Sequence, residues 1–166
     1  MTSPVGDLFR DYHASLVRML YRRTGDRDRA EDMAQEVFAR AVAAPPRNPK
    51  PWLFAVALNL VREDARKEGR RTRRLQLLKA EVEIDRMEVD PPLEHEERIA
   101  RIRQALDQLT ERDREALLLK AEGFNYGEIA ATLGLAPGAV GTTLSRARRR
   151  LVDAYRSLEK ERHVAS

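Results

Sequence analysis

The chain has 166 residues, a formal net charge of +4 and no cysteine, so it can form neither a disulfide nor a cysteine-ligated zinc site. Its three histidines lack metal-ligand spacing, and the longest apolar run, residues 52–58, is too short to cross a bilayer. Ala, Leu, Arg and Glu dominate while glycine is scarce, which favours an all-α protein.

The first 43 residues contain two helical patterns. Apolar residues recur at helical spacing over residues 7–24, up to Gly25, and again over residues 28–43. The segment before them has neither the basic cap nor the apolar core of a signal peptide, so none is expected. One face of the second helix is polar and mostly acidic, and it holds Glu31, Asp32, Gln35 and Glu36.

A proline-rich loop and a third helix come next. Four prolines between residues 45 and 51 interrupt any helix, and Pro51 suits the first turn of a new one. Residues 52–61 of that helix are apolar almost all round, so they are expected to be buried, and Trp52 fits the core better than a base-stacking surface. From Arg62 onward the helix is basic, which fits a nucleic-acid surface and a solvated face equally well. We predict a first helical domain over residues 1–75.

An acidic stretch separates this domain from the second. Residues 81–97 contain eight acids and only one base, Arg86. We therefore predict a linker over residues 76–95 and a second domain over residues 96–166. In that domain Thr110 with Asp113, and Asn125 with Glu128, have the spacing of helix N-cap pairs.

Residues 126–140 form a helix-turn-helix pattern. Ile129, Ala130 and Leu133 share one helix face, Gly134 ends that helix, and a new helical period starts at Val140. This pattern would present its second helix to a DNA major groove. The same spacing occurs in an ordinary helical hairpin, but the arginines that follow favour DNA binding.

Four segments in this order resemble the conserved regions of bacterial sigma factors. They are residues 30–38, residues 51–66, residues 109–116 and the helix-turn-helix. Length and spacing resemble the extracytoplasmic-function (ECF) group. The resemblance implies a promoter-specificity subunit that binds core RNA polymerase, recognises the −10 and −35 promoter elements and aids melting. It also implies an anti-sigma factor as partner, a cytoplasmic location, and no membrane contact of the chain's own.

The resemblance assigns site residues to three surfaces. For polymerase binding they are Glu31, Asp32, Gln35 and Glu36. For the −10 element they are Arg47, Asn48, Lys50, Arg62, Arg66, Lys67, Arg70 and Arg71. For the −35 element they are Ala139, Thr142, Thr143, Arg146 and Arg149.

Two features stay open at this point. Many family members have two cations at the start of the recognition helix, where this chain reads Gly141-Thr142-Thr143. The acidic linker fits both a mimic of nucleic acid and a plain solvated tether. No paired carboxylates, nucleophile-base set or phosphate loop appears, so we expect no catalysis, cofactor or metal. The alternative function is a stand-alone helix-turn-helix regulator.

Overall fold

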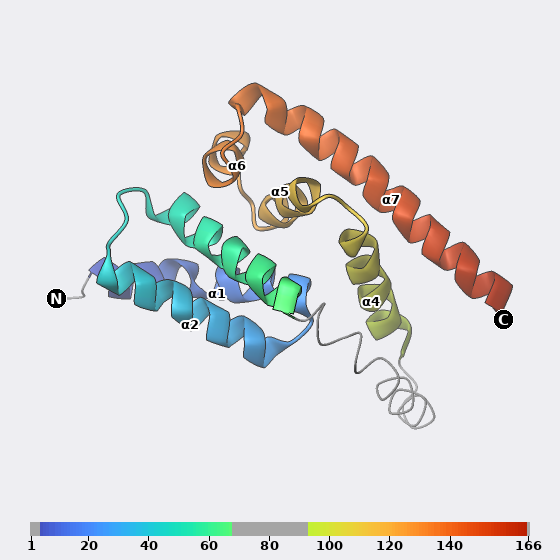
Figure 1. Ribbon diagram of the computed structural model, residues 1–166, viewed down its shortest axis with the longest axis horizontal. Coiled ribbons are helices and arrows are strands. Elements are labelled where there is room, and N and C mark those ends of the chain that lie inside the picture. The colour runs from blue at the N-terminus through green and yellow to red at the C-terminus, as the bar shows by residue number, and fades with distance from the viewer. Residues whose placement is uncertain (1–3, 68–92, 166) are drawn as a thin grey trace.

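The computed structural model describes residues 4–67 and 93–165, and every regular element in these ranges is helical. Figure 1 shows two groups of helices lying against each other. The predicted all-α fold with a helix-turn-helix in its second half is therefore confirmed. The predicted −10 residues Arg70 and Arg71, and most of the predicted linker, lie outside the described residues.

The first group contains α1 (Pro4–Thr24), α2 (Arg27–Ala43) and the helix of residues 49–67. Gly25 links α1 to α2 with a φ of +73°, a left-handed conformation that favours glycine. The helices meet through apolar stripes whose buried members include Leu20, Val37 and Leu58. Trp52 is partly buried and packs on this core, as the apolar pattern around it predicted.

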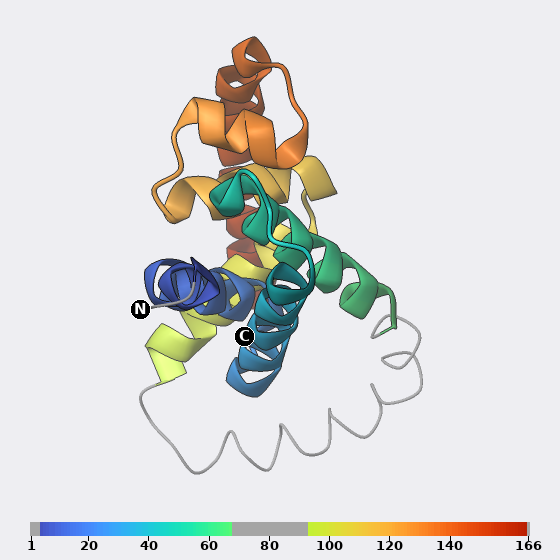
Figure 2. The same cartoon turned by 90° about the vertical axis from the view of Figure 1, so that its left-hand side faces the viewer.

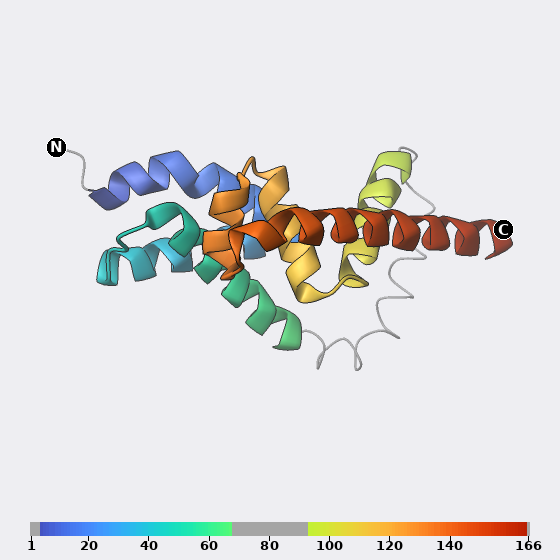
Figure 3. The same ribbon diagram turned by 90° about the horizontal axis from the view of Figure 1, so that it is seen from above.

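The second group contains α4 (Leu93–Asp107), α5 (Glu111–Ala121), α6 (Tyr126–Leu133), the short 3₁₀ helix η1 (Pro137–Ala139) and α7 (Val140–Ala165). The start of α4 lies within the stretch predicted as linker. Figure 3 shows α7 extending over the whole group to the C-terminal end of the chain.

Local caps determine where these helices begin and end. The Thr110 hydroxyl accepts a hydrogen bond from the Asp113 amide at the start of α5, and Asn125 with Glu128 forms a complete capping box at the start of α6. Gly134 ends α6 with a φ of +68°. These caps agree with the predictions from sequence because each depends on residues only three or four positions apart.

The two groups share one hydrophobic core. Phe54 of the 49–67 helix and Phe124, between α5 and α6, are both 1% exposed, and their ring centroids are 4.6 Å apart in an edge-to-face arrangement. Figure 2 shows the second group seated on the first. In the described ranges no helix is long and apolar enough to span a bilayer, and no His, Asp and Glu side chains cluster as metal ligands.

Candidate functional site

The acidic residues predicted on α2 lie on its outer face. Asp32, Gln35 and Glu36 are exposed and Glu31 is half-buried, because the opposite face of the helix is buried in the core. Two of the acids have a partner one turn away: Arg27 lies 3.6 Å from Glu31 and Arg40 lies 3.0 Å from Glu36. Exposed pairs of this kind contribute little to stability, so the carboxylates can exchange partners at low cost.

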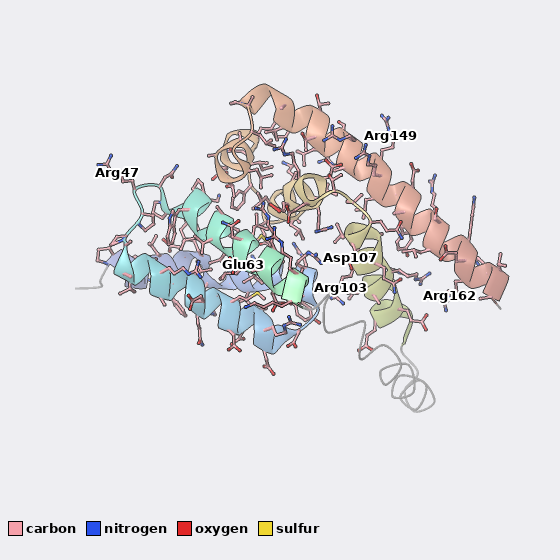
Figure 4. The ribbon with its side chains drawn as sticks, in the orientation of Figure 1. Arg47, Glu63, Arg103, Asp107, Arg149 and Arg162 are labelled. Carbon is pink, nitrogen blue, oxygen red and sulfur yellow. The ribbon has the colours of Figure 1, made fainter. Side chains whose placement is uncertain are left out.

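The residues predicted for the −10 element differ in their availability. Arg47 and Asn48 are exposed in the loop before the 49–67 helix, and Arg66 and Lys67 are exposed near the end of that helix. Figure 4 shows Arg47 projecting from its loop. Lys50 instead lies across the interface, with its ammonium 2.6 Å from Glu128 and 4.5 Å from the centre of the Phe124 ring.

Arg62 is also engaged by the second group of helices. Its Nε donates to Oε1 of Glu115 at 2.6 Å, its Nη2 pairs with the other oxygen of that carboxylate, and Glu111 lies 3.2 Å away. The hydrogen bond that Arg62 donates to Glu115 raises the pKa of Arg62 above its ordinary value, although partial burial opposes this. Arg62 therefore contributes to the contact between the groups in this arrangement.

Three more arginines join the groups along α1. Arg18 and Arg22 both bind Glu122 at the end of α5, at 3.2 and 3.0 Å, although the Glu122 side chain is only 2% exposed. Arg23 pairs with Asp107 of α4 at 2.7 Å. The sequence does not indicate these contacts, because the residues that form them are far apart along the chain and each alone has the pattern of a solvated face.

The start of α7 exposes a polar surface. Thr142, Arg146 and Arg149 are exposed as predicted, and Ala139 is half-buried. Figure 4 shows Arg149 pointing away from the body of the protein. Ser145 also lies on this exposed surface, and its spacing of three residues from Thr142 is the signal that could have identified it.

The expectation that Thr143 faces DNA is wrong for this structure. Thr143 is 5% exposed, and its hydroxyl donates to the carbonyl of Ala139 at 2.8 Å. The side chain therefore faces the interior of the helix-turn-helix, where its hydroxyl finds a partner within its own helix.

Asp113 of α5 was expected only as part of a helix cap, but it has a second set of contacts. Its side chain is fully buried and binds both Arg146 and Arg150 of α7, at 2.9 and 3.1 Å. Burial raises the pKa of Asp113, but the hydrogen bond and charge of Arg146, with the charge of Arg150, outweigh this and leave the pKa below its ordinary value. The carboxylate therefore stays ionised at neutral pH.

Comparison with known proteins matches both groups to one family. Residues 8–71 match the model of sigma-70 region 2, and residues 99–151 match that of sigma-70 region 4. ECF RNA polymerase sigma factor EcfG of Rhodopseudomonas palustris is 37% identical over 134 residues, covering 77% of this chain and 72% of that protein. The chain belongs to the ECF RNA polymerase sigma factors.

Other relatives agree with this assignment. Sigma factor SigE of Mycolicibacterium smegmatis is 31% identical over 157 residues, and the match covers 89% of the chain described here and 60% of SigE. Among solved structures, RpoE of Bartonella quintana, in complex with the anti-sigma factor NepR, is 26% identical with a TM-score of 0.57, covering 90% of this chain and 97% of that one. The ECF sigma factor described here is a promoter-recognition subunit for transcription initiation.

Proposed function

We propose that three surfaces divide the work of this sigma factor. The acidic face of α2 binds core RNA polymerase, the 44–48 loop with the 49–67 helix contacts the −10 element, and the start of α7 enters the major groove at the −35 element. The observation that carries this proposal is the exposed surface of α7, where Thr142, Arg146 and Arg149 point outward from a helix-turn-helix whose first helix, α6, begins at a capping box and ends at Gly134.

Polymerase binding rests on the charge and exposure of α2. Its carboxylates lie on the outer face, and their ion pairs are local and solvent-exposed. A basic surface on core polymerase would replace Arg27 and Arg40 as the partner without disturbing the packed side of the helix. Complementary charge of this kind accelerates docking and selects the partner more than it adds affinity.

Contact with the −10 element draws on cations and on the stiff loop. Arg47 and Asn48 lie exposed in a loop whose conformations the prolines restrict. Unstacking a base costs a few kcal/mol, and a loop that is already ordered before binding can hold the unstacked base without a further entropy loss. Arg66 and Lys67 face solvent, where they can meet phosphates. Arg70 and Arg71, which lie outside the described residues, belong to this proposal from the sequence alone.

The closed arrangement of the two groups competes with this contact. Lys50 and Arg62 cannot neutralise phosphates while they pair with Glu128 and Glu115. We infer that the groups part at this interface before the −10 element is fully bound. A pocket of about 220 Å³, partly open to solvent and lined by Arg62, Glu111 and Glu115 among others, lies at this interface, so water can reach these charged groups.

An anti-sigma factor that stabilises the closed arrangement is part of this proposal. The Bartonella relative was crystallised in complex with an anti-sigma factor. By holding the groups together, a partner of this kind would keep Lys50 and Arg62 paired and thereby delay promoter binding. The protein works in the cytoplasm, where polymerase and promoter DNA are found.

Reversal of charge on α2 tests the polymerase surface. The triple substitution Glu31→Lys, Asp32→Lys and Glu36→Lys should abolish binding to core polymerase and promoter-dependent transcription in vitro, while circular dichroism shows unchanged helix content. The control carries the same charge change elsewhere, with Asp11→Lys, Asp153→Lys and Glu161→Lys at exposed positions on α1 and α7. Core binding retained by the α2 variant would place the docking surface elsewhere.

A further inference from the structure

Asp113 is a buried acid on α5 that binds two arginines of α7, the helix proposed to contact DNA. It occupies the third position of α5, where the helix dipole favours a negative charge. Its Oδ1 accepts from Nη2 of Arg146 at 2.9 Å, and its Oδ2 lies 3.4 Å from Nε of the same guanidinium. Oδ2 also accepts from Nη1 of Arg150 at 3.1 Å.

These contacts use only one edge of the Arg146 guanidinium. An arginine has five N–H donors, and Asp113 accepts from two of its nitrogens. The Arg146 side chain stays 44% exposed, so the rest of the planar group faces solvent on the surface of α7. Two donors in a fixed plane are what bidentate recognition of a guanine requires.

Asp113 also sets the charge of this surface. One carboxylate faces two arginines that are four residues apart on α7 and would repel each other without it. The three side chains together carry +1, whereas the two arginines alone would carry +2. The exposed Arg149 lies outside this cluster and offers its full charge to phosphates.

We propose that Asp113 is a positioning residue for −35 recognition, which fixes the orientation of Arg146 for base reading and limits the non-specific attraction of α7 for phosphates. This inference rests on the proposed placement of α7 at the −35 element. Loss of the carboxylate should therefore have two opposite effects. It should raise non-specific affinity, because a cation becomes available to phosphates, and it should lower sequence preference, because Arg146 is no longer held in place.

The variant Asp113→Asn tests this proposal, because asparagine has the size of aspartate but no charge. The two arginines that lose their partner are exposed to solvent, so the substitution leaves no unpaired charge buried in the protein. Holoenzyme reconstituted from core RNA polymerase and the full chain is first presented with a promoter pool randomised in the −35 region. Binding to the selected promoter, and to the same promoter with a scrambled −35 region, is then measured against salt concentration. Asp153→Asn, the same change of charge at an exposed position on α7, is the control, and Arg149→Ala calibrates the loss of one phosphate contact.

With Asp113→Asn we expect the preference for the selected −35 sequence to fall by about tenfold. Affinity for the scrambled template should rise, and the slope of log K against log salt should steepen by up to about 0.9. The double variant Asp113→Asn with Arg150→Gln should restore the parental slope but not the preference. Asp153→Asn should keep the preference.

Two results would overturn the inference. A variant that loses affinity for both templates in parallel would show that Asp113 only stabilises the fold, and an unchanged preference would show that it does not position Arg146. If the parental holoenzyme itself has no −35 preference, the proposed placement of α7 fails, and that result is distinct because it appears before any substitution.

Discussion

Buried carboxylates decide which arginines of this sigma factor are available for partners. Glu122 is bound by two arginines of α1, Glu115 by Arg62, and Asp113 by two arginines of α7. A carboxylate that stays buried after losing its partner is strongly destabilising, so each of these acids holds its cations for as long as the helices around it stay packed. Arg47 and Arg149, which face solvent, are therefore the better candidates for first contact with DNA.

The ionisation of Asp113 and Glu128 predicts how stability depends on pH. The pKa of Glu128 is lowered, first by the hydrogen bond from the Asn125 amide and then by Lys50, and the pKa of Asp113 is lowered by its arginines despite burial. A lowered pKa contributes stability above the ordinary values of 4.5 and 3.8, and this contribution is lost as pH falls through the folded values.

We therefore expect the free energy of unfolding, measured with urea, to decrease as the solution is acidified below about pH 4.5. The double variant Asp113→Asn with Glu128→Gln should be less stable at neutral pH and should show a shallower dependence on acid. Parallel pH curves for the parent and the variant would contradict the assignment.

At the scale of elements, two glycines of the helix-turn-helix have opposite effects. Gly134 ends α6 with a positive φ, a conformation that costs other residues about 1–2 kcal/mol. Gly141 is the second residue of α7, where an alanine would lose less conformational entropy on folding, and an added Cβ would meet Tyr126 at an ordinary contact distance of 3.5 Å.

Substitution by alanine should separate these two positions. Gly134→Ala should lower the free energy of unfolding by about 1 kcal/mol or more, whereas Gly141→Ala should raise it by about 0.5–1 kcal/mol. Chemical denaturation of both variants measures the difference. A loss of stability in Gly141→Ala would mean that α7 needs closer approach at this point than the structure indicates.

Across the whole molecule, charge pairs and the shared apolar core around Phe54 and Phe124 hold the two helical groups together. Substitution of Glu115→Gln and Glu122→Gln should open them, because it leaves Arg18 and Arg22 without a carboxylate and leaves Arg62 with Glu111 alone. The chain lacks cysteine, so Ala39→Cys and Ala131→Cys provide two unique exposed sites for fluorescent labels, one in each group.

Energy transfer between these labels should be high in the parental protein and should fall in the double glutamine variant. Glu63→Gln with Glu161→Gln removes the same charge from exposed positions and should leave the transfer unchanged. Equal transfer in all three proteins would show that the apolar contact around Phe54 and Phe124 alone keeps the groups closed.

The sequence by itself determined the helices, their caps and the family. Thr110, the Asn125–Glu128 pair and Gly134 act within one helical turn, so their effects can be read from neighbouring residues. The exposed acids of α2 and the exposed Thr142, Arg146 and Arg149 of α7 follow from the same helical periodicity.

Only the tertiary structure decided which of the predicted cations are already paired. Arg62 and Glu115 are 53 residues apart, Asp113 and Arg146 are 33 apart, and Arg18 and Glu122 are 104 apart. Pairing over such separations depends on how the packed helices are oriented, and helical periodicity carries no information about it. For the same reason the sequence placed Thr143 toward DNA, whereas packing of α7 turns it inward.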